Sequence, residues 1–391
     1  MTTIPYIGQK ALRILERSIR FGTLTVVTPE GIKRTMAGRE PGPQGTIVIN
    51  DWRTISAAFA EGDIGLGNAY MAGWWESPGL EDLLKVLMLN MDGLGRLAWG
   101  SYLHRIRSVL LEWAFRRNSL KGSKRNIMAH YDVGNDFYSR WLDPTMTYSS
   151  AIFAEPGIDL ESAQKAKYAR ILDRIGGKQG PVLEIGCGWG GFTEAAVREG
   201  HGVTALTISP RQHDYAKTRV GASADIKLQD YRKERGTFSS IVSIEMFEAV
   251  GERYWPTYFQ TLRERLTANG VAVIQTISIS EQLFPSYRLS SDYIRHHIFP
   301  GGMLPSVSRF RQESERAGLA VRDVFSFGQD YARTCREWLH RFDSALPDIR
   351  ALGYEEGFLR GWRLYLAMCA GAFALGRTDV HQFELVPVRR Q

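Results

Sequence analysis

Cysteine is scarce in this chain of 391 residues. Cys187, Cys335 and Cys369 are widely spaced and form no CxxC pair, which argues against a disulfide framework or a zinc site and fits a reducing cytoplasm. No uninterrupted run of about 18 apolar residues occurs, so no transmembrane helix is expected. The first twenty residues contain no apolar core followed by a small-residue cleavage site, so no secretory signal is expected either.

Histidine is also sparse, with eight residues in the whole chain. His130, His296 and His297 lie close to the motifs described below. None of the three has the spacing from cysteines or carboxylates that a metal site requires. We therefore expect structural or surface roles for these histidines and predict no metal.

Basic residues exceed acidic ones by 49 to 42, which gives a formal charge of +7. Such an excess favours an anionic partner, either nucleic acid or an acidic membrane surface. Residues 104–125 contain seven Lys or Arg and one Glu, and the first part of this segment has apolar residues at helical spacing. A basic amphipathic helix can lie on an anionic bilayer. The alternative is a connecting helix that docks on the protein's own core with its arginines in solvent.

The pattern of the chain changes along its length and predicts two domains. Residues 1–100 mix strand-like runs with short helical runs and predict a small N-terminal lipid-binding or accessory domain. Residues 101–126 are the basic amphipathic linker helix. From about residue 160, helical and strand-like runs alternate, which predicts an α/β fold whose parallel sheet carries helices on both faces. We assign residues 127–391 to this catalytic domain and expect its ligands beyond the carboxyl ends of the strands.

The sequence LEIGCGWGGF at residues 183–192 joins an apolar run to a glycine-rich stretch. Glycines directly after a strand and before a helix let the backbone turn sharply and approach a ligand closely. The acidic Glu184 suits a cationic amino-acid group better than a pyrophosphate. The alternative is a tight turn without a ligand. Cys187 is interpreted as a turn residue and not as a nucleophile.

This motif resembles the first sheet motif of S-adenosylmethionine (SAM) methyltransferases, and its tryptophan form is typical of cyclopropane-fatty-acyl-phospholipid synthases. Residues 65–75 resemble the smaller N-terminal domain of the longer bacterial members. The resemblance implies a Rossmann-like SAM methyltransferase sheet preceded by a smaller α+β domain. Six further stretches match the family in order, namely residues 130–153, 206–217, 243–251, 298–306, 327–338 and 366–373.

The resemblance also implies which residues contact SAM. An acidic side chain after the third strand suits the adenine amine, and a tyrosine can supply a flat face to the ring. Thr207 and Gln212 could instead cap a helix or lie on its solvated face. The full cofactor-binding set is Tyr148, Ser149, Glu184, Gly186, Gly188, Gly190, Thr207, Gln212, Asp230 and Tyr231.

The implied reaction is methyl transfer to the double bond of an unsaturated fatty-acyl chain in membrane phospholipid. An alkene is a weak nucleophile, so precise positioning in a dry pocket dominates catalysis. The attack leaves a carbocation, which aromatic faces and a nearby anion can stabilise. Loss of a proton from the added methyl group then closes a cyclopropane ring.

The resemblance implies that a bound bicarbonate ion accepts this proton in members of the family. Glu248, Tyr331 and the backbone amide of Ile277 match three positions that hold it. The chain departs from the family at two others, where Ser150 replaces a cysteine and Gln275 replaces a histidine. Gln275 can orient an anion but cannot relay a proton. These departures are either tolerated in an ordinary cyclopropane synthase, or they direct the carbocation to a methyl-branched or methylene chain.

Three other functions remain as alternatives. The chain could methylate a soluble small molecule, or it could bind lipid or SAM without turnover. A nucleic-acid methyltransferase is disfavoured, because no basic stripe interleaved with stacking aromatics accompanies the site. The expected partners are phospholipid with unsaturated acyl chains and an anionic bilayer surface, without nucleic acid. The protein is expected in the cytoplasm, peripherally associated with the inner face of the membrane, and a homodimer is compatible with the family.

Overall fold

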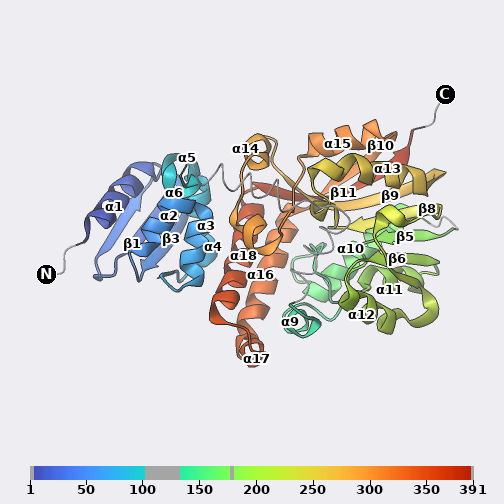
Figure 1. Ribbon diagram of the computed structural model, residues 1–391, viewed down its shortest axis with the longest axis horizontal. Coiled ribbons are helices and arrows are strands. Elements are labelled where there is room, and N and C mark those ends of the chain that lie inside the picture. The colour runs from blue at the N-terminus through green and yellow to red at the C-terminus, as the bar shows by residue number, and fades with distance from the viewer. Residues whose placement is uncertain (1–3, 102–132, 177–179, 389–391) are drawn as a thin grey trace. The chain divides into compact units, whose positions relative to one another are not determined.

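The computed structural model describes residues 4–101, 133–176 and 180–388. These residues fall into two compact units (Figure 1). The first unit contains the described part of residues 1–114 together with residues 289–298 and 338–375; the second contains the described parts of residues 115–288, 299–337 and 376–391. The predicted basic linker helix, residues 101–126, lies outside the described residues except for its first position.

The first unit is built on a four-stranded sheet with the order β2-β1-β3-β4. Alternate residues of β1 are buried, as expected for a strand with one face on a core. Gly45 of β3 lets helix α4 approach closely, since a Cβ atom there would lie 2.6 Å from the Cα atom of Leu83. The strands are β1 (Phe21–Val27), β2 (Lys33–Ala37), β3 (Glu40–Ile49) and β4 (Trp75–Glu76). The helices of the N-terminal part are α1 (Tyr6–Ser18), α2 (Arg53–Glu61), α3 (Asp63–Met71), α4 (Leu80–Leu89), α5 (Met91–Leu94) and α6 (Arg96–Trp99).

Segments from the second half of the chain complete this first unit. This division differs from the prediction, which assigns all of residues 127–391 to a single catalytic domain. They include the π-helical η5 (Ile294–Ile298), the end of α16 (Gly328–Ser344), α17 (Leu346–Ala351) and α18 (Glu356–Ala374). Arg360 of α18 donates hydrogen bonds to the carbonyl oxygens of Tyr70 (2.5 Å) and Trp75 (2.9 Å). The hydroxyl of Tyr293 donates to the carbonyl of Gly361 at 3.2 Å. Contacts between residues as much as 290 positions apart leave no local pattern in the sequence.

The second unit contains a seven-stranded sheet with the order β10-β11-β9-β8-β5-β6-β7. The strands β9-β8-β5-β6-β7 are mutually parallel, while β11 pairs antiparallel with both β9 and β10. The chain starts this sheet in its middle at β5 and builds outwards in both directions, so the switch in strand order lies between β5 and β8, where α/β sheets bind ligands. The strands are β5 (Val182–Ile185), β6 (Val203–Thr207), β7 (Asp225–Leu228), β8 (Phe238–Ile244), β9 (Leu266–Ile279), β10 (Leu319–Ser326) and β11 (Thr378–Pro387).

Helices cover both faces of this sheet, which confirms the predicted fold class (Figure 1). Leu183 and Ile185 of β5 pack in the same hydrophobic cluster as α13 (Trp255–Arg265) and α15 (Val307–Arg316). Val182 points to the other cluster, with α10 (Leu160–Ile175), α11 (Gly191–Arg198) and α12 (Pro210–Val220). The remaining short elements are α9 (Asn135–Ser139), η1 (Gly221–Ser223), η2 (Tyr231–Lys233), η3 (Phe247–Ala249), η4 (Glu252–Tyr254) and α14 (Phe284–Arg288).

Within residues 4–101, 133–176 and 180–388, no helix is both long enough and apolar enough to cross a membrane.

Candidate active site

The glycine turn follows β5 at the switch in strand order. The backbone amides of Gly186 and Cys187 both donate to the carbonyl of Leu206 at 2.9 Å, which ties the turn to β6. Gly186, Gly188 and Gly190 have φ angles of 86°, 53° and 84°, a region that glycine adopts without steric cost. A Cβ atom at Gly188 would meet no atom within 4 Å, so the backbone there faces open space. The turn therefore has the shape expected of a ligand cradle, and contact of these glycines with SAM stays a prediction.

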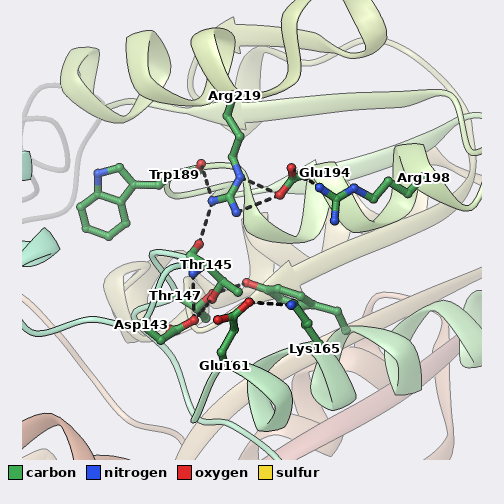
Figure 2. A network of polar contacts seen from close by, with 10 residues as sticks. Asp143, Thr145, Thr147, Glu161, Lys165, Trp189, Glu194, Arg198 and Arg219 are labelled. Atoms are coloured by element: carbon green, nitrogen blue, oxygen red, sulfur yellow. Dashed lines mark hydrogen bonds and ion pairs between the residues drawn. The ribbon is translucent and has the colours of Figure 1, made fainter. Parts of the chain in front are cut away.

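Arg219 of α12 connects this turn to the segment that carries Tyr148 and Ser149 (Figure 2). Its guanidinium donates to the carbonyl of Thr145 at 2.7 Å and to the carbonyl of Trp189 at 3.5 Å. It also forms an ion pair of 2.8 Å with Glu194 of α11. Because one planar group holds both backbone segments, it fixes the two predicted cofactor-binding stretches relative to each other.

A series of side-chain hydrogen bonds also orders the segment that carries Tyr148 and Ser149. Asp143 accepts from the backbone amide of Thr145 at 2.8 Å and from its hydroxyl at 2.5 Å. The hydroxyls of Thr145 and Thr147 lie 2.6 Å apart, and Thr147 lies 2.6 Å from the hydroxyl of Tyr168 on α10. The side chain of Tyr148 packs among aromatic rings, 5.5 Å from Tyr138 between ring centroids.

Ser149 is held by a fully buried lysine that was not among the predicted site residues. Lys167 of α10 donates to the hydroxyl of Ser149 at 2.7 Å and to the side-chain carbonyl of Gln164 at 2.6 Å. The amide nitrogen of Gln164 in turn donates to the backbone carbonyl of Ser149 at 2.9 Å. Burial lowers the pKa of Lys167 to about 7, against the opposing pull of nearby carboxylates.

Glu184 is buried on β5 and accepts a hydrogen bond from the hydroxyl of Thr193 on α11. Burial raises the pKa of Glu184 to about 7, while Thr193 and the charge of Lys167 act in the opposite direction. A nearby cationic ligand would lower that pKa and keep the carboxylate ionised. Burial also raises the pKa of the Cys187 thiol well above its usual range, which agrees with its interpretation as a turn residue.

The predicted residues after β6 and β7 form two further groups. The hydroxyl of Thr207 donates to the side-chain carbonyl of Gln212 at 3.0 Å. Ser209 is the residue that caps α12, by accepting from the backbone amide of Gln212, so capping is not the role of Thr207. Asp230 caps η2 and forms an ion pair of 2.6 Å with Arg232. The side chain of Tyr231 is buried against Tyr258, with 5.6 Å between ring centroids.

The predicted anion site contains a carboxylate of the chain itself, Glu245, which directly follows β8. One carboxylate oxygen accepts from the backbone amide of Ser150 at 2.9 Å and from the side-chain amide of Gln275 at 2.8 Å. The other accepts from the hydroxyl of Tyr331 at 2.5 Å. Three of the groups predicted to hold bicarbonate therefore hold Glu245 instead.

Glu248 binds the remaining predicted donor. One of its oxygens accepts from the backbone amide of Ile277 at 2.5 Å and from the hydroxyl of Thr276 at 3.0 Å. Its second oxygen is buried and has no hydrogen-bond partner among the described residues. Burial, and then the charge of Glu245, raise the pKa of Glu248 to about 8.

Burial raises the pKa of both carboxyl groups, but their hydrogen bonds differ. Burial raises the pKa of Glu245 as well, but the hydrogen bonds from Tyr331, Gln275 and Ser150 and the charge of Lys167 favour its ionised form. Two neighbouring buried carboxylates cannot both ionise without a large electrostatic cost. Because Glu245 has three donors and Glu248 has an oxygen without a partner, the hydrogen bonds favour the ionised form at Glu245 and the protonated form at Glu248.

Glu245 adopts an uncommon backbone conformation, with φ at 49°. A residue other than glycine in this left-handed region costs about 1–3 kcal/mol and is found mostly where the surrounding structure requires it. Glu245 was not among the site residues predicted from the sequence, although SIEMFEAVG contains this second carboxylate three positions before Glu248. That spacing is the signal that could have revealed it.

A second layer of hydrogen bonds fixes the orientation of Gln275. The side-chain carbonyl of Gln275 accepts from the amide nitrogen of Gln382 at 3.0 Å, across the register that pairs β9 with β11. The carbonyl of Gln382 accepts from Arg170 of α10 at 2.7 Å. Because its oxygen is occupied by Gln382, the nitrogen of Gln275 faces Glu245.

His296 and His297, two of the three histidines close to the sequence motifs, belong to the first unit. His297 is 2.8 Å from the side-chain oxygen of Asn68, and both residues belong to the first unit. His130 lies outside the described residues. Among the residues that the structure describes, no group of three or more His, Cys, Asp or Glu could hold a metal ion.

Comparisons with known proteins agree on one family. The family model described as mycolic acid cyclopropane synthetase matches residues 118–383. The chain is 38% identical over 341 residues to a tuberculostearic acid methyltransferase of Mycobacterium tuberculosis, covering 83% of this chain and 79% of the relative. It is 39% identical over 321 residues to cyclopropane-fatty-acyl-phospholipid synthase of Escherichia coli, covering 80% of each. A solved mycolic acid cyclopropane synthase, complexed with SAH and CTAB, is similar with a TM-score of 0.63 and 31% identity, over 67% of this chain and 97% of that structure.

Proposed function

Because the chain belongs to the mycolic acid cyclopropane synthetase family, we propose that it methylates the double bond of an unsaturated fatty-acyl chain in phospholipid and closes a cyclopropane ring. The observation that carries this proposal is the pair of partly buried carboxyl groups, Glu245 and Glu248, next to the glycine turn. A Cβ atom at Gly186 would lie 2.8 Å from the side chain of Met246, the residue between them in sequence. The pair supplies negative charge and a proton acceptor close to the predicted methyl donor.

The residues at the carboxyl ends of β5, β6 and β7 fit SAM as the methyl donor. The open backbone at Gly188 leaves room for a ligand, and the buried Glu184 suits its ammonium group. Thr207, Gln212, Asp230 and Tyr231 would contact the ribose and adenine. When bound, SAM supplies an electrophilic methyl group.

The chain's own residues then stabilise what the transfer leaves behind. Methyl transfer turns the alkene into a carbocation, and the negative charge of Glu245 lowers the energy of that cation. The aromatic cluster around Tyr148 can add the attraction of ring faces for a cation. The bicarbonate that the resemblance implies would have to displace Glu245 from its donors, so the function is proposed without it.

The substrate is proposed to reach the enzyme at a membrane surface. The relative from Escherichia coli is named for fatty-acyl phospholipid, and the net charge of +7 favours an anionic bilayer. We place the protein in the cytoplasm, peripherally associated with the inner face of the membrane. A homodimer is compatible with this arrangement.

A second outcome, a methyl-branched or methylene acyl chain, is favoured by one observation. Gln275 cannot be protonated, so the proton handling around the carbocation differs from that of a histidine-bearing site. The relative from Mycobacterium tuberculosis is named a tuberculostearic acid methyltransferase. The two outcomes share every step up to the carbocation.

Product analysis tests the function and separates these outcomes. The full-length protein is incubated with SAM and anionic liposomes that contain monounsaturated phospholipid, and the acyl chains are identified by mass spectrometry. A cyclopropane chain supports the proposal, whereas a methyl-branched or methylene chain replaces it with the second outcome. SAM binding without any acyl product would contradict both. Methylation of soluble molecules without binding to the liposomes would indicate a small-molecule enzyme.

A further inference from the structure

Glu245 occupies the position that the resemblance assigns to a bound bicarbonate. We propose that the Glu245 carboxylate is itself the catalytic base and that the reaction proceeds without bicarbonate, an inference that rests on the proposed function. The departures at Ser150 and Gln275 then belong to a site whose anion is built into the chain.

The hydrogen-bond donors around Glu245 already bind Glu245 and Glu248, and they would have to release these residues to bind a second anion. The backbone amide of Ser150, the side chain of Gln275 and the hydroxyl of Tyr331 all donate to Glu245. The backbone amide of Ile277 donates to Glu248. A bicarbonate ion would take these donors from the two glutamates and would leave their carboxyl groups buried and unsatisfied. It would also add a negative charge beside the partly buried carboxylate of Glu245, which is unfavourable.

The carboxylate of Glu245 can accept the proton that the reaction releases. The C–H bond of the newly added methyl group breaks, its electron pair forms the second ring bond to the cationic carbon, and the proton goes to an oxygen of Glu245. The base is then a neutral acid and the acyl chain is neutral, so charge and atoms balance. Burial and the charge of Glu245 raise the pKa of Glu248 and so favour its protonated form, and the positive charge of Lys167 lowers the pKa of Glu245.

Arg170 and Gln382 act as positioning residues for this base. Gln382 accepts from Arg170 at 2.7 Å and donates to Gln275 at 3.0 Å. The amide of Gln275 is thereby aligned so that its nitrogen, and not its oxygen, meets the carboxylate. A neutral amide donor stabilises the ionised base without offering it a competing proton.

Two substitutions at position 245 test the assignment. Glu245→Gln keeps the shape of the side chain but cannot accept the proton, so activity is expected to fall by about 10²–10⁴-fold and not to respond to added bicarbonate. Glu245→Gly removes the side chain at a φ angle of 49° that glycine adopts freely, so the variant should fold. It is expected to be equally impaired and to regain activity when bicarbonate or formate is added, because the added anion can accept the hydrogen bonds of Ser150, Gln275 and Tyr331 that Glu245 accepts in the wild-type protein.

The wild-type protein is assayed in buffer freed of carbon dioxide, with and without added bicarbonate, and equal rates are expected. The assignment is overturned if the wild-type rate depends on bicarbonate, if Glu245→Gln retains the wild-type rate, or if Glu245→Gly is fully active in the depleted buffer. SAM affinity, measured by calorimetry for all three proteins, shows that each variant is folded and competent for binding. Failure of the proposed function is distinct, since the wild-type protein would then modify no acyl chain under either condition.

Discussion

The side-chain amide of Gln275 donates a hydrogen bond of 2.8 Å to the carboxylate of Glu245. A glutamine at this position would be a poor replacement for a histidine if a free anion had to be bound and a proton relayed. Opposite a carboxylate that is part of the chain, it is a suitable partner, because it donates without titrating. Glu245 and Gln275 are therefore complementary to each other.

Gln382→Leu should disturb catalysis through this pair. Without its partner, the carbonyl of Gln275 is free to rotate towards Glu245 and place two acceptors against each other. We expect kcat to fall about tenfold with KM unchanged, since small misplacements of catalytic groups have effects of this order or larger. The kinetic parameters and the pH profile of kcat/KM are measured together, and an unchanged kcat would contradict the positioning role.

Tyr331→Phe should shift the pH dependence of the reaction. The hydroxyl of Tyr331 lowers the pKa of Glu245, so its removal raises that pKa further. A base must be ionised to act, so the acidic limb of the kcat/KM profile moves to higher pH and activity near neutral pH decreases. A profile whose acidic limb stays in place, with only its height reduced, would argue that Tyr331 does not act through Glu245.

Glu248→Gln should stabilise the fold in a pH-dependent manner. The pKa of Glu248 is raised in the folded protein to about 8, from an ordinary value near 4.5, so the wild-type protein loses stability as the pH rises between these values. Glutamine resembles the protonated acid and does not titrate. The gain in unfolding temperature is therefore expected to be larger at about pH 8 than at about pH 5. The exposed Glu16→Gln serves as the control for loss of one negative charge, and equal gains at both pH values would contradict the assigned proton.

Lys167→Met should weaken SAM binding. Lys167 donates to Ser149, and its charge lowers the pKa of Glu184, so its removal disturbs two predicted cofactor contacts. A lost hydrogen bond to a charged group corresponds to about a tenfold increase in Kd. Calorimetry of the variant is compared with Lys165→Met on the same helix, where the lysine pairs with Glu161 and its side chain is 59% exposed. Equal affinities of the two variants would contradict the role of Lys167.

Arg219→Lys keeps the positive charge but loses the planar fork that joins Thr145, Trp189 and Glu194 (Figure 2). We expect a lower unfolding temperature and a higher Kd for SAM, corresponding to about 1.5–3 kcal/mol for the lost charged hydrogen bonds. Arg198→Lys is the matched control, because Arg198 pairs with the same Glu194 but its side chain is 70% exposed. If both variants behave alike, Arg219 does not hold the two segments together.

The sheet of the second unit was predictable because its signals are local. Alternating helical and strand-like runs fix the order of the elements, and the glycine turn after β5 marks the ligand-binding end of the sheet. The membership of the first unit was not predictable in this way. Arg360 and Tyr70 meet across 290 residues, and no periodicity in either segment encodes that contact.

The site was predicted in part. Ser150, Gln275, Tyr331 and Ile277 lie around the carboxyl groups of Glu245 and Glu248, whereas the resemblance implies that these four residues and Glu248 hold a bicarbonate ion. The centre of the group was missed, because a motif comparison identifies the residues that hold an anion and not the residue that replaces it. The burial of Lys167 was not predicted either, because a lysine in a helix with polar neighbours is usually at the surface.

The reaction of the wild-type protein with liposomes of monounsaturated phospholipid, in buffer freed of carbon dioxide, is the most direct test of a reaction that uses Glu245 as its base. Mass spectrometry of the acyl chains is expected to show cyclopropane product, formed at the same rate before and after bicarbonate is added. The absence of any modified acyl chain, or a product that forms only when bicarbonate is present, would contradict the account.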